Sequence, residues 1–190
     1  MHTLQKLFIV ALILLIPQFA LAENWKIDPA HTAVEFKIKH LMISWVKGTF
    51  TDVQGAVVFD EAEPEKAAVN VQIATASVDT GNKKRDDHLK SPDFFDAAKY
   101  PKIRFTSIGV KAKGSQFTVK GNLTMHGKTK LVSIPFKVAK GKNGAGVDVT
   151  TYKGKLTLDR NEFGIGTDSI AAKISLEDEV EIELLIVTFQ

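Results

Sequence analysis

Strict alternation of apolar and polar residues is the feature that most constrains the fold, because successive side chains of a β-strand point to opposite faces. Val34, Phe36 and Ile38 alternate with charged residues, and the same period resumes at Val57 and Phe59. It continues at positions 69–73, 103–105, 117–125, 132–138, 147–158 and 180–186. We therefore expect eight or more strands, each with one apolar face. Antiparallel pairing is favoured because no helical segments alternate with the strands.

Strands of this number and length can close as an up-and-down barrel or stack as a sandwich. Closure is favoured because an eight-stranded barrel has no free edge and has an interior just wide enough for side chains or one small ligand. The inward face is made of Val, Ile and Phe with almost no charge, so a ligand held there should be apolar. The fold prediction is an all-β, eight-stranded antiparallel barrel with one short helical insertion around residues 82–98.

That insertion lies within Thr80–Pro101, the one long interruption between predicted strands. Asn82 can cap a first helical turn, and Ser91 can cap a second. The second turn carries Phe94 and Phe95 between two aspartates, so one of its sides has to be buried. The two rings either cover an apolar cavity as a lid or plug the end of an ordinary core, and both interpretations stay open at this point.

Residues 1–22 are expected to be a signal peptide, which leaves 23–190 as one exported domain. An unbroken apolar run at 7–16 is followed by Ala20-Leu21-Ala22, a small-residue cleavage pattern. Ten apolar residues are too few to span a bilayer, which takes about 20. The chain contains no Cys, so it has no disulfide. A domain of this size can do without one in a bacterial periplasm, which is the predicted location.

No nucleic-acid partner is expected, because the net charge of +3 is too small to predict one. Its distribution is uneven: residues 111–142 hold eight Lys and no acid, whereas 177–183 hold five acids and no base. Such runs are either the solvated faces of strands or a docking surface for a membrane or an acidic partner. For docking, four lysines are expected to cluster at turns: Lys128, Lys130, Lys140 and Lys142.

Motifs for catalysis are absent from the sequence, which has no nucleophilic Cys, no G-x-S-x-G elbow, no P-loop and no G-x-G-x-x-G after a strand. The histidines of the predicted domain lack metal-site spacing, so neither a metal nor an enzymatic activity is expected: His31, His40, His88 and His126. A metal-dependent enzyme built on these histidines is one alternative function, and a ligand-free interaction module is another. His40 has inward parity and could bond either a ligand head group or neighbouring backbone.

Spaced motifs run through the whole predicted domain. They are Trp25-x-Ile27-Asp28-x-x-His31, Phe36-x-x-x-His40, Ser44-x-x-x-Gly48-x-Phe50, Arg85-Asp86-x-His88-Leu89, Phe94-Phe95 with Tyr100-Pro101, Gly121-x-Leu123-x-x-His126-Gly127 and Arg160-x-x-Phe163-Gly164. Together they resemble the YceI-like family of polyisoprenoid-binding proteins. The resemblance implies an extended lipocalin-like barrel, periplasmic or secreted, whose tunnel holds an isoprenoid or other lipid chain, with no enzymatic activity established for the family as a whole. Position 32 is Thr where the family has Ser, which keeps the hydroxyl.

The predicted function is thus a periplasmic binding or carrier protein for a polyisoprenoid, an isoprenoid quinone or a similar lipid, with no other cofactor. Expected partners are this ligand and, transiently, a membrane surface or a membrane redox or biosynthetic enzyme; a homodimer is left open. The resemblance favours the lid interpretation of the insertion. The predicted ligand contacts are Phe36, Ile38, His40, Val57, Phe59, Val71, Ile73, His88, Phe94, Phe95, Phe105, Leu123, Met125, Ile134, Phe136, Ile182 and Leu184. Head-group contacts are predicted for Arg85, Asp86, His126 and Arg160.

Overall fold

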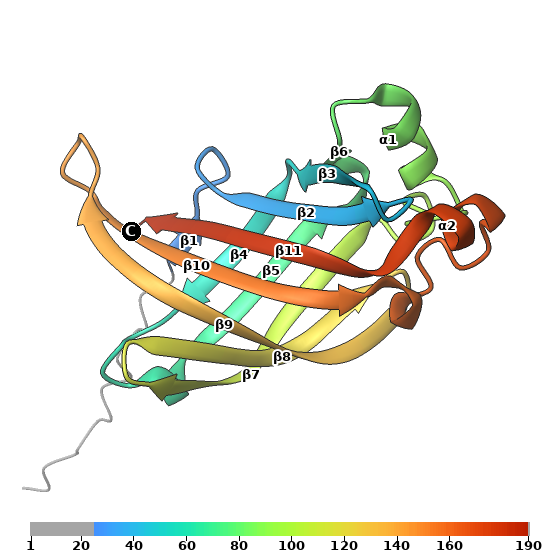
Figure 1. Ribbon diagram of the computed structural model, residues 1–190. Helices are drawn as coiled ribbons and strands as arrows, with labels where there is room; N and C mark the ends of the chain where they lie inside the picture. The colour runs from blue at the N-terminus through green and yellow to red at the C-terminus, as the bar shows by residue number, and fades with distance from the viewer. Residues whose placement is uncertain (1–24, 190) are drawn as a thin grey trace, which may run out of the picture.

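The structure is a computed structural model that describes residues 25–189, and its strands form one antiparallel sheet closed into a barrel (Figure 1). The predicted signal peptide lies outside the described residues. The strands are β1 (Trp25–Ile27), β2 (Ala33–His40), β3 (Ser44–Phe50), β4 (Val53–Val58), β5 (Ala68–Ala74), β6 (Val78–Asp79), β7 (Lys102–Lys113), β8 (Gln116–Met125), β9 (Lys128–Lys142), β10 (Asp148–Asp159) and β11 (Leu176–Phe189). The helices are α1 (Lys83–Lys90) and α2 (Ile170–Ser175), with short 3₁₀ segments η1 (Pro64–Lys66), η2 (Thr75–Ser77) and η3 (Arg160–Phe163).

The barrel has eight positions, three of which are filled by interrupted strands. β1 and β2 share one position, β3 and β4 the next, and β5 and β6 the third, because β2 pairs with β3, β1 with β4, β3 with β6 and β4 with β5. From β7 to β11 each strand pairs with the next one along the chain, and β11 closes the barrel against both β2 and β1. The predicted eight-stranded antiparallel barrel is confirmed.

The break between β1 and β2 is bridged by a side chain. The Oγ1 of Thr32 accepts a hydrogen bond from the Val187 amide at 3.1 Å and donates to the Val187 carbonyl at 3.4 Å, which replaces a missing rung of the ladder to β11. Asp28 closes the loop before it by accepting hydrogen bonds from Ala30 N at 2.9 Å and His31 Nδ1 at 2.7 Å. The hydrogen bond from His31 lowers the pKa of the Asp28 carboxyl. The Thr32 hydroxyl therefore supports the closure of the barrel, which the backbone pairing of β11 with β1 and β2 provides.

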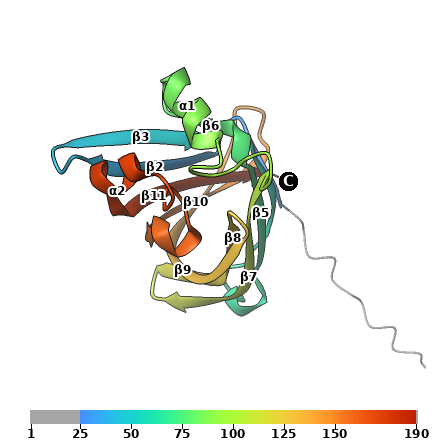
Figure 2. The ribbon, with the colours of Figure 1, turned by 90° about the vertical axis from the view of Figure 1, so that its right-hand side faces the viewer.

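The two ends of the barrel differ in their connections. We call the end formed by residues 28–32, 59–67, 113–116 and 142–148 the hairpin end, and the end formed by 40–44, 74–101, 125–128 and 159–176 the helical end. Figure 1 shows both helices gathered at the helical end, and Figure 2 views the barrel from that side. Among the residues described, no helix combines the length and the apolar character that crossing a bilayer would take.

The helical content departs from the sequence prediction in two respects. α1 begins after Asn82, whose side chain accepts a hydrogen bond from Arg85 N at 3.1 Å, as predicted. The second predicted helical turn is instead a set of hydrogen-bonded turns, since Asp96 has a φ of 46° that a right-handed helix cannot include. The helix α2, capped by Ser169, was not predicted, because six residues are too few to display a helical period.

Candidate ligand-binding cavity

An apolar cavity of about 160 Å³ lies inside the barrel. Its wall takes side chains from all eight barrel positions. Apart from Gly154, the wall residues are aliphatic, aromatic or Met, and none of them is charged. Such a wall binds hydrocarbon through the hydrophobic effect and dispersion, and it gives an ionic ligand no partner.

Eleven of the seventeen predicted ligand contacts lie on this wall: Val57, Phe59, Val71, Ile73, Phe105, Leu123, Met125, Ile134, Phe136, Ile182 and Leu184. The wall also includes residues that the prediction left out: Val34, Phe50, Val69, Ile103, Val119, Tyr152, Gly154, Leu156, Leu158 and Ile186. They share the inward parity of their strands, so the alternation could have identified them. The prediction missed most on β10, where the apolar residues 152, 156 and 158 alternate with Thr and Lys.

The cavity is closed at the hairpin end by a cluster of aromatic rings. Phe59 packs edge-on against Phe117, Phe136 and Tyr152, with ring centroids 5.0, 5.6 and 5.8 Å apart. Phe117 and Phe136 also stack on each other at 5.6 Å. Burial raises the pKa of Tyr152 to about 12, so its phenol stays neutral at physiological pH. Four mutually packed rings make this end of the cavity solid.

Three predicted ligand contacts on β2 lie outside the cavity, toward the helical end of the barrel. β2 contributes Val34 alone to the wall, whereas Phe36, Ile38 and His40 follow it along the strand. The ring of Phe36 covers Gly48, where an added Cβ would come within 2.4 Å of it, and packs against Phe50 at 5.8 Å. These residues have the predicted inward parity, but the cavity ends before it reaches them.

The match to a model of the YceI-like domain extends over residues 25–188. The chain belongs to the YceI-like family. Protein YceI of Salmonella newport (strain SL254) is 37% identical over 179 residues, which cover 93% of this chain and 94% of that protein. The crystal structure of Burkholderia cenocepacia BcnA has a TM-score of 0.77 at 33% identity, over 85% of this chain and 98% of that one. A polyisoprenoid-binding domain from Saccharophagus degradans, described as implicated in plant cell wall breakdown, shares the fold at 14% identity, with a TM-score of 0.68 over 87% and 97% of the two chains.

The YceI-like pair Phe94 and Phe95 divides between two layers. Phe94 is buried in a cluster with Phe163, Ile165 and Ala172, beneath η3 and α2, and does not line the cavity. Phe95 packs edge-on against Phe50, a cavity-wall residue, with centroids 5.6 Å apart. The first ring therefore anchors the insertion, as the plug interpretation expects, while the second contacts the cavity wall through Phe50, which is the placement that the lid interpretation requires.

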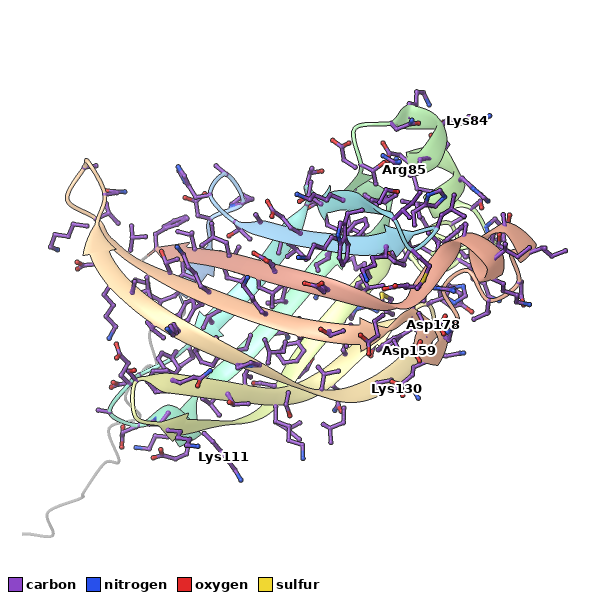
Figure 3. The ribbon with its side chains drawn as sticks, viewed as in Figure 1. Lys84, Arg85, Lys111, Lys130, Asp159 and Asp178 are labelled. Carbon is purple, nitrogen blue, oxygen red and sulfur yellow. The ribbon has the colours of Figure 1, made fainter. Side chains whose placement is uncertain are left out.

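The YceI-like motif on α1 secures the start of the insertion. Arg85 donates from Nε to Thr80 Oγ1 at 2.8 Å and from Nη2 to Thr80 O at 3.0 Å, while Asp86 accepts from Thr80 N at 2.9 Å and from Thr80 Oγ1 at 2.5 Å. These hydrogen bonds, above all the one from the Thr80 hydroxyl, lower the pKa of Asp86. His88 is bonded to Asp93 at 3.0 Å, and its ring packs edge-on against Phe94. Figure 3 shows Arg85 on α1, and neither it nor Asp86 lines the cavity.

The other YceI-like polar residues hold η3 in place. Arg160 is buried, 5% exposed, and donates to the carbonyls of Glu177 at 2.9 Å and Ile165 at 3.0 Å and to Asp178 Oδ1 at 3.1 Å. His126 Nδ1 donates to Phe163 O at 3.1 Å. A carbonyl only accepts, so this nitrogen carries the proton. Within residues 25–189 none of the four predicted head-group contacts lies on the cavity wall, and these two act as clamps on the backbone.

The four histidines are not brought together at one site. Residues 25–189 hold no group of three or more His, Cys, Asp or Glu side chains arranged to bind a metal. His31 lies at the hairpin end and the other three at the helical end, where His88 and His126 are held by Asp93 and Phe163. The alternative of a metal-dependent enzyme built on these histidines therefore finds no support in their positions.

The predicted lysine cluster is wrong. Lys130 and Lys140 lie ten residues apart on the extended strand β9, which separates them by about 33 Å at 3.3 Å per residue. Lys128 belongs with the first at the helical end and Lys142 with the second at the hairpin end. Lys140 and Lys142 also pair with Glu61 at 3.0 Å and Asp148 at 2.5 Å. Figure 3 shows Lys111 and Lys130, two members of the same run, at opposite ends of the barrel.

Proposed function

We propose that this protein binds the apolar chain of a lipid inside its barrel and carries it through the periplasm, without catalysis. The observation that carries the proposal is the cavity, whose uncharged wall is drawn from all eight barrel positions. Each buried methylene contributes about 0.8 kcal/mol, so ten contribute roughly 8 kcal/mol before the cost of ordering the chain. Hydrophobic contact is thus the main source of binding free energy, and it grows with the length of chain that the cavity takes.

A prenyl chain is the lipid class that we favour. The Saccharophagus degradans structure is described as a polyisoprenoid-binding domain, and it shares this fold. A branched, unsaturated chain is also chemically compatible with a wall of Val, Ile, Leu and Phe side chains. Export to the periplasm is supported by the charge, apolar run and cleavage pattern at positions 1–22.

The size of the cavity sets a requirement for binding. Its volume of about 160 Å³ is close to that of an engineered apolar cavity, about 150 Å³, that accepts benzene. One prenyl unit is of comparable size, so a longer chain requires wall residues to move. The four-ring cluster makes the hairpin end the harder one to widen, whereas the flexible Met125 lies at the helical end. Entry is therefore expected at the helical end.

The test is lipid identification followed by reconstitution. Protein purified from a periplasmic extract is analysed by native mass spectrometry, and its organic extract is analysed for lipids. Delipidated protein is then titrated with prenyl alcohols of increasing length, and the variant Ile134→Asn is compared with Ser133→Asn, its outward neighbour on β9. We expect a prenyl lipid in the extract and a large loss of affinity in Ile134→Asn alone. An extract without lipid, together with no uptake by delipidated protein, would favour the ligand-free interaction module.

A further inference from the structure

Five large aliphatic side chains are exposed at the helical end. Their exposed fractions are 51% for Leu41, 74% for Met42, 86% for Ile43, 75% for Ile170 and 76% for Ile174. The first three form the turn between β2 and β3, and the other two lie four residues apart on one face of α2. The turn and α2 are neighbours, since Leu41 N donates to Ser175 O at 2.7 Å, and Figure 2 shows them side by side. We call these five residues the apolar lip.

The backbone of the turn gives no reason for apolar residues there. Leu41 and Met42 have φ values of 52° and 64°, in the left-handed region that is sterically disfavoured for side chains of this kind. The Ile43 amide donates to the His40 carbonyl at 3.3 Å, and turns whose two central residues both have positive φ usually carry Asn, Asp or Gly there. The chain keeps Leu and Met at these two positions in spite of the strain, which indicates that their side chains contact something outside the folded domain.

The residues around the lip match the chemistry of a bilayer surface. Two of the three lysines in the hairpin segment 36–50 are paired with acids of β11, Lys37 with Glu181 at 2.9 Å and Lys39 with Glu177 at 3.4 Å. Within residues 25–189, Lys47 of the hairpin and Lys173 of α2 have no ion pair, and the α2 segment 169–176 contains no acid. Trp45, 44% exposed, lies next to the turn, with the ammonium groups of Lys37 and Lys39 at 5.1 and 5.6 Å from its ring. Aliphatic side chains favour the acyl region, whereas Trp and Lys favour the head-group level of anionic membranes.

We propose that the apolar lip inserts into the surface of a bilayer containing anionic phospholipid and holds the helical end of the barrel against it. The lip projects from the same end of the barrel as Phe95, which packs on the cavity-wall ring of Phe50. Docking would let an apolar ligand pass between bilayer and barrel without crossing water. The transfer of ligand from the bilayer rests on the proposed function. The docking of the lip on the bilayer is tested separately from that function.

The decisive variant replaces the turn by one that its backbone prefers. Leu41→Asn with Met42→Gly removes two lip side chains and relieves the strain, so the fold is expected to persist. Delipidated protein purified from a periplasmic extract is mixed with vesicles of three parts phosphatidylcholine and one part phosphatidylglycerol, and the bound fraction is measured by flotation. We expect wild-type protein to bind, the double variant to lose at least tenfold in partition coefficient, and wild-type binding to fall severalfold on pure phosphatidylcholine. The matched control is Ile108→Ser, which removes an exposed aliphatic residue (59%) from β7 and is expected to change binding less than twofold.

Each other result would overturn the proposal. Insertion of the lip would be excluded if wild-type protein does not bind the vesicles. It would also be excluded if the double variant binds them as well as wild type does. A wild-type dimer in sedimentation that the double variant converts to a monomer, without vesicle binding, would assign the lip to a contact between two copies of the chain. Lipid uptake from ethanol solution separates the two proposals: uptake without vesicle binding would contradict docking alone, and vesicle binding without uptake would contradict lipid binding alone.

Discussion

The two ends of the barrel are built on opposite principles. The hairpin end has short connections and four packed rings. The helical end has the long segments 74–101 and 159–176, one ring packed on the cavity wall, and exposed aliphatic side chains. Both ends enclose the same cavity, so we expect the hairpin end to contribute mainly stability and the helical end to be the route of ligand entry that the proposed function requires.

The helical end is anchored at a few points and not throughout. Phe94 and Phe163 form an apolar anchor, while Arg160 and His126 clamp backbone carbonyls of η3 and its surroundings. Phe95 and Met125 pack both against this anchor and against the core cluster that contains the cavity-wall residues Val34 and Phe50. We therefore expect ligand entry at this end to move these two side chains while the anchors stay in place.

The largest effect is expected at the hairpin end. Phe117→Ala removes a ring that is 5% exposed from the four-ring cluster, and it should lower the free energy of unfolding by about 3–5 kcal/mol. Urea unfolding measures this, with Lys120→Ala, an exposed site on the same strand, as the control. A loss below about 1 kcal/mol would show that the cluster can collapse, and the contrast in rigidity between the two ends would then be wrong.

The two neighbouring phenylalanines should separate stability from access. Phe94→Ala opens a buried cluster and is expected to destabilise the protein by roughly 2–4 kcal/mol, with little change in ligand off-rate. Phe95→Ala is expected to destabilise it less and to accelerate ligand release at least tenfold. Stopped-flow exchange into empty acceptor vesicles gives the rates, and thermal unfolding of the delipidated variants gives the stabilities. Equal effects of the two changes would mean that both rings serve one role.

Arg160→Met tests the clamp on η3. It leaves the carbonyls of Ile165 and Glu177 without their donor, which should cost about 2–3 kcal/mol. Asp178→Asn should change stability by less than about 1 kcal/mol, since that carboxylate is 63% exposed. Hydrogen exchange should show that the loss of amide protection is concentrated in residues 160–176. Faster exchange spread evenly over the barrel would mean that Arg160 supports the whole fold and does not act locally.

The barrel could be predicted from the sequence because the alternation of apolar and polar residues shows which face of each strand is buried. It could not state how far along a strand the cavity extends, so Phe36, Ile38 and His40 were assigned to a wall that ends before them. It also could not place residues at one end or the other, which is why lysines at opposite ends of β9 were expected to cluster.

The polar residues of the motifs were harder to interpret for a different reason. A charged residue in a spaced motif suggests a ligand contact, yet Arg160 and His126 donate to backbone carbonyls, whose positions depend on the tertiary fold. The sequence does contain a pattern that indicates the apolar lip: Leu41-Met42-Ile43 interrupts the alternation of β2 at the place where a turn is needed. Turns between regular strands are normally polar, so three apolar residues there predict an exposed apolar surface.

The smallest expected effect concerns the hydrogen bonds that start the insertion. The hydroxyl of Thr80 lowers the pKa of Asp86 below its usual value of 3.8, so the carboxylate is more stable folded than unfolded. The resulting stability is present above pH 4 and is lost as the pH falls through the lowered pKa. Thr80→Val removes the hydroxyl and keeps the shape, so the pKa of Asp86 should rise toward 3.8, as followed by NMR titration of the carboxyl carbon. The melting temperatures of Thr80→Val and wild type should differ slightly at pH 7 and converge once the pH lies below the lowered pKa of Asp86. A difference that persists unchanged in acid would assign the effect to the hydrogen bond from Arg85 to Thr80, and the anchor of α1 would then be independent of the charge on Asp86.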